Sequence, residues 1–208
     1  MPAEERRAAI IAAAIPLVCD HGAAVTTREI AEAAGIAEGT IFRVFPDKDA
    51  VIRAVVDKVL DPAPYVTALR RIDPDQELEQ VLAEAVDAMR SRLESVWQIM
   101  WMLRLSGPPG DERDRSKYAP SARPDLSAAN QAMADLLLPH RDRLRLSPME
   151  STRMFRLVTF SSAHPAITDG HMLSTPEIVD LLLHGIAVHT VRPSIDRSEF
   201  RTEEVGVL

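Results

Sequence analysis

Residues 26–48 hold the side chains whose types and spacing suit recognition chemistry, in the stretch TTREIAEAAGIAEGTIFRVFPDK. Hydroxyl, guanidinium and ammonium groups hydrogen-bond to phosphates and to the edges of bases, and all three occur here. We expect a DNA-contacting surface formed by the starts and polar sides of two short helical patterns: Thr26, Thr27, Arg28, Glu38, Gly39, Thr40, Phe42, Arg43 and Lys48.

Three of these residues have separate expected roles. Arg43 lies on an outer side of the second pattern, where a guanidinium can read base edges. Lys48 falls in the first turn of the next helix, a placement that the helix dipole disfavours and that a phosphate contact would explain. Glu38 has two interpretations: it accepts a hydrogen bond from cytosine N4, or it stays a solvated carboxylate at a helix start.

Local signals predict where the first of the two helices begins and ends. Thr26 with Glu29 three residues later is a capping box, which contributes ~1 kcal/mol and starts a helix at Thr27. Gly35 follows the last apolar residue of this pattern, at a position where the backbone often needs a positive φ. The chain is therefore expected to turn at Gly35.

The second helix is predicted to face one side inward. Ile41, Phe42 and Phe45 repeat at helical spacing. Pro46 ends this helix, and Asp47 is placed to cap the next one. Two short helices joined by a glycine turn form a helix-turn-helix, which places its second helix in a DNA groove.

The order and spacing of residues in this region resemble the N-terminal domain of the TetR family. The resemblance runs without a gap from residue 6 to about residue 56 and rests on Ile10, Ala13, Ala14, Gly22, Thr26, Ile30, Ala31, Ala34, Gly35, Gly39, Thr40, Phe45, Lys48 and Val51. Residues 164–186 are similar to the family's connection between its last two helices. The resemblance implies an all-α homodimer that represses transcription and leaves DNA when a small molecule enters a pocket in its second domain.

Three positions depart from the residues usual in the family. Ala37 stands where serine is usual, and Phe42 stands where a tyrosine hydroxyl reaches the DNA backbone in relatives. Glu38 stands where a basic residue is frequent. The resemblance leaves open how these positions alter DNA binding.

The charge balance argues against a protein that coats nucleic acid generally. The chain has 208 residues and a net charge of −7, and acidic residues outnumber basic ones even in 26–48. Binding must rest on a few placed contacts and backbone N–H groups, which predicts a modest salt dependence. We divide the all-α chain into a three-helix helix-turn-helix domain (1–46), a helical effector-binding and dimerisation domain (47–192) and a polar tail (193–208).

The N-terminus mimics a signal peptide, because two arginines precede an apolar run. Two glutamates precede the arginines, which argues against a signal peptide. No apolar run reaches the ~18 residues of a membrane helix. We therefore expect no membrane segment and a cytoplasmic protein. The single cysteine, Cys19, excludes an internal disulfide and fits that compartment. Pro16 lies inside the first helical pattern, where it costs up to ~3 kcal/mol or kinks the helix.

Helical patterns cover most of the remaining chain. A strut helix is expected from the Asp47 cap to Leu60, followed by a long helix from Asp73 and Pro74 to Leu105 with a break within 91–95. A long loop is expected at 107–124, and a helix follows it at 126–138. Two more helices are expected, one beginning at Pro148 and capped by Ser147, the other running from Pro176 to Val191 and capped by Thr175.

An effector pocket is predicted beside the end of the long helix, where two tryptophans and an arginine lie three or four residues apart and share a face. With partners from later helices, its expected lining is Trp97, Met100, Trp101, Arg104, Met133 and Phe155. From spacing alone, the two tryptophans could equally well fill the hydrophobic core or line a pocket. The family resemblance favours the pocket. Arg104 is either a cation at the pocket mouth or a surface residue.

The last two helical patterns are apolar around more of their circumference than a monomer surface tolerates. We expect them to pair with a second copy of the chain through Met154, Leu157, Val158, Ile178, Leu181, Leu182 and Ile186. The alternative is burial of these residues within one subunit.

Signals for an enzyme are weak. His164, His171, His184 and His189 lack the paired spacing of a zinc site, and no Gly-rich phosphate loop occurs. We expect no cofactor, no metal and no catalytic residue. The leading hypothesis is a repressor released from a near-palindromic operator by a small apolar ligand. The alternatives are a dimeric DNA-binding protein without an effector and a metal-dependent enzyme.

Overall fold

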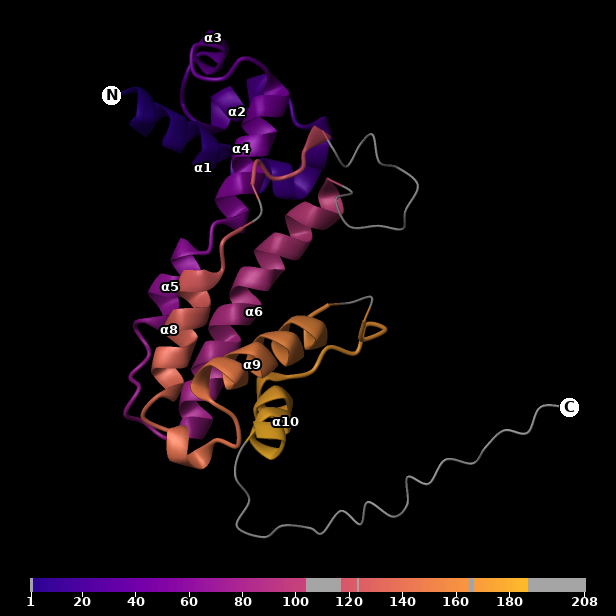
Figure 1. The fold of residues 1–208 in the computed structure, drawn as a ribbon. Helices are drawn as coiled ribbons and strands as arrows, with labels where there is room; N and C mark the ends of the chain where they lie inside the picture. The colour runs from indigo at the N-terminus through magenta and orange to yellow at the C-terminus, as the bar shows by residue number, and fades with distance from the viewer. Residues whose placement is uncertain (1, 104–116, 123, 165–166, 187–208) are drawn as a thin grey trace, which may run out of the picture.

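The computed structural model describes residues 2–103, 117–122, 124–164 and 167–186. These residues are helical and contain no strand, which confirms the predicted all-α class. One end of the molecule consists of α1 (Ala3–His21), η1 (Gly22–Ala24), α2 (Thr27–Ala33), α3 (Glu38–Ile41) and α4 (Lys48–Leu60). The other end is a bundle of α5 (Ala63–Leu69), α6 (Leu78–Met102), α8 (Ser127–Leu137), η2 (Arg141–Arg143), α9 (Pro148–Ser162) and α10 (Thr175–Ile186). Figure 1 shows α6 running from the bundle to the first end.

Two hydrophobic cores underlie these two ends. The first unites buried residues of α1, α2, α3 and α4, and it includes Ile99 and Leu103 at the far end of α6. The second unites α5, α6, α8, α9 and α10. The expected domain boundary between residues 46 and 47 assigns α4 to the second domain, but α4 packs into the first core. The division into domains stays a prediction.

The first helix passes through Pro16 without interruption. Pro16 has no N–H to donate to the carbonyl of Ala12, but both residues are exposed, so water can satisfy that carbonyl. Residues Ala3–Ala24 are long and apolar enough to cross a membrane by length and composition. On one side of this helix Ile10, Ala14 and Val18 are buried in the first core, as in a core helix of a globular domain.

The helix boundaries after α4 differ from the prediction in three ways. The short helix α5 was not expected. The long helix begins at Leu78 rather than at Pro74, because the carboxylate of Asp73 accepts the N–H of Asp75 in a turn at 3.0 Å. It continues without the predicted break, and its described part ends at Met102, while Leu105 lies outside the described residues.

Residues 117–122 are not a free loop, contrary to the expectation for 107–124. Tyr118 is buried in the first core, and its hydroxyl donates to Asp49 of α4 at 2.8 Å. Lys117 forms an ion pair with the same carboxylate at 3.0 Å, and Ser121 donates twice to Asp57. This segment therefore braces α4 from outside; residues 107–116 lie outside the described part of the chain.

The caps of the last two helices were predicted with one error. Ser147 caps α9, as expected, and the structure adds a full capping box with Glu150. At α10 the residue that caps the helix start is Ser174 rather than Thr175. The backbone N–H and the hydroxyl of Ser174 both donate to the carboxylate of Glu177 in the first turn. Thr175 instead donates its hydroxyl to Asp87 of α6.

Candidate functional site

The first helix of the helix-turn-helix is fixed at both ends by local hydrogen bonds. The N–H of Glu29 donates to the Thr26 hydroxyl oxygen at 3.2 Å, and the Thr26 N–H donates to the Glu29 carboxylate at 2.8 Å, which confirms the capping box. Gly35 has a φ of +64°. The N–H of Gly35 donates to Glu32 and that of Ile36 donates to Ala31, the pattern of a Schellman motif.

The second helix, α3, is short and divides its residues between the interior and the surface. Ile41 and Phe45 are buried in the first core. Phe42 is 53% exposed, so the expectation that it packs inward is wrong. The reason is that α3 ends at Ile41 and the chain continues in turns, which point Phe42 away from the core. Ala37 precedes α3 without a side-chain cap, as its departure from serine implies.

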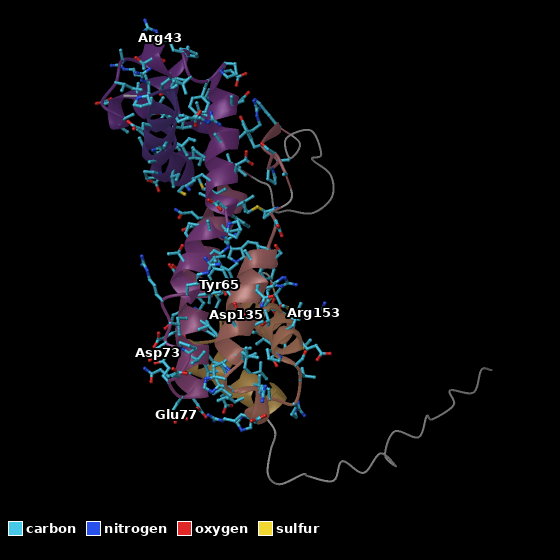
Figure 2. All side chains as sticks on the ribbon, turned by 60° about the vertical axis from the view of Figure 1, so that its left-hand side comes forward. Arg43, Tyr65, Asp73, Glu77, Asp135 and Arg153 are labelled. Atoms are coloured by element: carbon cyan, nitrogen blue, oxygen red, sulfur yellow. The ribbon has the colours of Figure 1, made fainter. Side chains whose placement is uncertain are left out.

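The residues expected to contact DNA lie mostly on one outward surface. Those that are exposed are Thr26, Arg28, Glu38, Gly39, Phe42 and Arg43, and those that are half-buried are Thr27, Thr40 and Lys48. In Figure 2 the label of Arg43 marks the tip of the molecule farthest from the bundle. A Cβ added at Gly39 would meet no atom within 4 Å, so a partner can approach the α3 backbone closely.

Three of these residues have partners that the sequence did not indicate. The hydroxyl of Thr27 donates to the carboxylate of Glu38, which joins the start of α2 to the start of α3. The ammonium of Lys48 donates to the carbonyl of Ala23 at 2.8 Å and so joins α4 to η1. Both bonds link segments more than ten residues apart, and they orient the surface groups before any DNA arrives.

The bundle contains a cavity of about 260 Å³ between α5, α6, α8 and α9. Its lining is mainly apolar and consists of Leu60, Tyr65, Met89, Arg92, Leu93, Val96, Pro124, Leu126, Ala129, Asn130, Met133, Thr152, Phe155, Arg156 and Phe160. Of the residues predicted for an effector pocket, Met133 and Phe155 line this cavity. The cavity is at the small end of ligand-binding pockets, ~300–1,000 Å³.

The tryptophans predicted for this pocket do not line it, and neither does Met100. Trp97 is half-buried and packs on Phe160 and His164, with ring centroids 4.9 Å and 4.3 Å away. Trp101 is 76% exposed. Trp97 and Trp101 lie one turn apart on the same face of α6, but α9 covers only Trp97. The two side chains therefore differ in burial although they share a helix face. Arg104 lies outside the described residues.

The polar groups of the cavity come from four helices, α5, α6, α8 and α9. The Arg92 guanidinium donates to the carbonyls of Asp61 at 2.7 Å and Leu60 at 2.8 Å. Arg156 donates to the Asn130 side-chain oxygen at 3.1 Å. The Tyr65 hydroxyl is buried and has no hydrogen-bond partner within the described part of the chain. Burial raises the pKa of Tyr65 and lowers the pKa of Arg92.

The residues predicted for a dimer interface separate into two groups. Ile178 is fully buried and Leu182 is 2% exposed, both inside one subunit, so the interface prediction is wrong for them. They lie four residues apart on the side of α10 that joins the second core. Met154, Leu157 and Leu181 remain exposed, and Val158 is half-buried against the second core. The side chain of Ile186 lies outside the described residues.

The described residues include no group of three His, Cys, Asp or Glu side chains able to hold a metal ion. Cys19 is half-buried beside Asp20, and burial and that carboxylate raise the pKa of its thiol. A thiol with a raised pKa is a poor nucleophile at neutral pH.

Comparison with known proteins agrees with the geometry. Residues 10–55 match the family model of bacterial regulatory proteins of the tetR family. No curated protein matches the chain in sequence. A TetR-family transcriptional regulator of Mesorhizobium loti is similar in fold, with a TM-score of 0.58 and 18% identity over 90% of this chain and 100% of that one.

A second similar structure is SmeT, the repressor of the Stenotrophomonas maltophilia multidrug efflux pump SmeDEF. It has a TM-score of 0.55 and 22% identity over 88% of this chain and 91% of that one. The SmeT–triclosan complex has a TM-score of 0.56 and 22% identity over 89% and 93% of the two chains. Residues 10–55 are therefore a helix-turn-helix domain of the TetR type, and the described chain shares the fold of solved TetR-family transcriptional regulators.

Proposed function

We propose that this protein is a cytoplasmic repressor that binds a near-palindromic operator as a homodimer and leaves it when a small, mostly apolar ligand fills the cavity. One observation carries the proposal. Gly39, Phe42 and Arg43 are exposed at the tip of the molecule, while Ile41 and Phe45 of the same segment are buried. This division lets the core hold α3 firmly while its outer side enters a major groove.

The proposed contacts follow from position and chemistry. Arg43 reads a base edge, and Phe42 offers apolar surface suited to a thymine methyl group. Thr26, Thr27 and Arg28 surround the start of α2, where backbone N–H groups favour a phosphate. Lys48 uses one donor on Ala23, and its ammonium has further donors for a phosphate.

Glu38 and Thr40 complete the surface, with different tasks. Glu38 already accepts a hydrogen bond from Thr27, so its main effect is to hold α2 and α3 in register. The half-buried Thr40 lies one residue after the unobstructed Gly39, where its hydroxyl can donate to a phosphate or a base.

The cavity supports the effector half of the proposal over a DNA-binding protein without an effector. A close-packed bundle has few hollows larger than a water molecule, so a mainly apolar one of about 260 Å³ is a natural place for a small apolar ligand. SmeT, which shares the fold, has been solved as a complex with triclosan. We therefore place the ligand among Met133, Phe155 and Val96.

The homodimer is proposed to form through the exposed apolar side of α9 and α10. Met154, Leu157 and Leu181 are 39%, 56% and 50% exposed, more than an unpartnered helix pair would be expected to leave open. Sedimentation should show a dimer at micromolar concentration, and Leu157→Glu should convert it to a folded monomer. A wild-type protein that sediments as a monomer would refute this part.

The DNA-binding proposal is tested by selection from random duplexes with the purified full chain. We expect enrichment of a near-palindrome whose half-sites lie about one helical turn apart. Arg43→Ala should weaken binding by ~1–3 kcal/mol and relax the preference at one position of each half-site. Lys48→Ala should weaken all duplexes alike. Arg141→Ala is the matched control, because Arg141 is an exposed arginine in η2 of the bundle. Failure to enrich any duplex would refute the proposal.

A further inference from the structure

We propose that the ligand of the cavity is an apolar molecule with one acidic group, and that Arg92 binds this group and thereby loosens the end of α4. The inference rests on the proposed function, because it names the ligand class and the regulation of the same cavity. It depends on three groups that line the cavity from α5, α6 and α9: Tyr65, Arg92 and Arg156.

The charges around the cavity favour an anion. Two arginines line it, and no carboxylate does so among the described residues. Within the described part of the chain, Arg156 donates to a neutral amide and Arg92 to two neutral carbonyls, and neither forms an ion pair. The remaining walls are mainly apolar, so a charge in the cavity is weakly screened. A cationic ligand would be repelled. The Asp61 carboxylate acts on Arg92 from outside this cavity, so within the cavity a neutral ligand would place no anion beside either guanidinium group.

Tyr65 belongs to the cavity wall, and its hydroxyl is proposed as a donor to the acidic group. Tyr65 is only 5% exposed, lines the cavity and has no hydrogen-bond partner in the described structure. A buried hydroxyl left unpaired costs ~1–3 kcal/mol, which an acceptor atom of a ligand would relieve. Because burial keeps this phenol protonated, it is a donor, and a carboxylate is the acceptor that complements it.

Arg92 connects this position to the DNA-binding domain. Its two hydrogen bonds end on Leu60, the last residue of α4, and on Asp61, which follows it. A cation is favourable at a helix C-terminus because it satisfies unpaired carbonyls. Tyr65 and Arg92 also line a second cavity of about 420 Å³, whose walls include Ile15 of α1 and Val59 of α4. The guanidinium therefore lies between the ligand site and the first core.

An acidic ligand would compete with α4 for this guanidinium. Charge-assisted hydrogen bonds to a carboxylate are about twice as strong as bonds to a neutral carbonyl. If the guanidinium turns to the ligand, the carbonyls of Leu60 and Asp61 lose their partner and the last turn of α4 loosens. The first turn of the same helix holds Lys48 on η1, so a change in α4 reaches the DNA-contacting surface.

Calorimetry with the full chain and three probes of equal shape tests the ligand class. The probes are 2-naphthoate, the neutral 2-naphthamide and the cationic 2-naphthylmethylamine. We expect the anion to bind at least tenfold more tightly than the amide, with the amine weakest. Arg156→Met should reduce that ratio without removing it, because Arg92 still binds the acidic group, and Tyr65→Phe should weaken the anion more than the amide. Arg153→Met is the control, because Arg153 lies on the same helix, is exposed and projects away from the bundle (Figure 2).

Hydrogen exchange tests the role of Arg92. The anion should increase amide exchange at residues 58–64, and the amide should not. Arg92→Lys keeps the charge but lacks the paired donors of a guanidinium, so it should bind the anion without this response. Equal binding of anion and amide, tightest binding of the amine, or no binding of any probe would overturn the ligand class. Anion binding without faster exchange would overturn the role of Arg92. If a neutral ligand releases the protein from the duplex enriched in the selection experiment, this inference alone is overturned. If no duplex is enriched in that experiment, the proposed function alone is overturned.

Discussion

Replacing Gly22 with alanine tests how the DNA-binding domain is held against α6. Gly22 has a φ of +57° and a ψ of −134°, a backbone conformation that residues with a side chain rarely adopt. A Cβ at this position would lie 2.6 Å from the carbonyl oxygen of Met102 and 3.3 Å from its carbonyl carbon. Both are backbone atoms at the end of α6, so no side-chain rotation can relieve the contact.

Two costs add in this variant. Forcing an alanine into such a conformation costs ~1–3 kcal/mol. Overpacking against a fixed neighbour costs a further ~1–3 kcal/mol, so the free energy of unfolding should fall by about 2–6 kcal/mol. A protein of this length loses ~2–4 °C in Tm per kcal/mol, which gives a decrease on the order of 5–20 °C.

Calorimetry and urea unfolding at one fixed protein concentration measure this loss, since the stability of a dimer depends on concentration. Gly39→Ala is the matched control: Gly39 has an ordinary φ and nothing within 4 Å of an added Cβ. That variant should gain up to ~1 kcal/mol of stability and lose DNA affinity, because its methyl group meets the groove. A Gly22→Ala protein that melts within about 2 °C of the wild type would refute the reasoning.

Three further predictions concern stability and exposure. Thr26→Ala removes the capping box and should cost ~1 kcal/mol in urea unfolding, whereas Thr26→Ser should keep most of it; equal losses would contradict the cap. The N–H of Ala63 lowers the pKa of Asp61, so this carboxylate stabilises the fold at neutral pH and loses its effect as the pH falls below ~4. The stability gap between wild type and Asp61→Asn should shrink over that range, and a constant gap would exclude the linkage. Acrylamide should quench Trp101 in a Trp97→Phe protein far more than Trp97 in a Trp101→Phe protein, and similar quenching would contradict their exposures.

The features that the sequence predicted correctly are those whose partners lie within one helical turn. Thr26 and Glu29, like Ser147 and Glu150, are three residues apart, so their hydrogen bonds need no other part of the fold. The positive φ of Gly35 is equally local. Caps and turns of this kind can be predicted because local chemistry alone decides them.

Predictions failed where a distant neighbour decides the outcome. One failure was local instead: Pro74 looked like a first helical residue, but the side chain of the adjacent Asp73 stabilises a turn there. The pattern of α10 showed two apolar sides without showing which one another helix would cover. Ile178 packs into the second core and Leu181 does not, a difference that depends on where α6 and α9 lie.

The cavity shows the same limit at the level of function. Trp97 and Trp101 satisfied a rule of spacing along one helix, yet only the first is covered by α9. Tyr65, Arg92 and Arg156 satisfied no such rule, because each comes from a different helix. What marks them is an unpaired hydroxyl and two guanidinium groups on neutral acceptors, and these are visible only once the fold brings them together. Since Arg92 lines the cavity and donates to the last carbonyls of α4, the proposed ligand would need to displace only one side chain to affect the DNA-binding end.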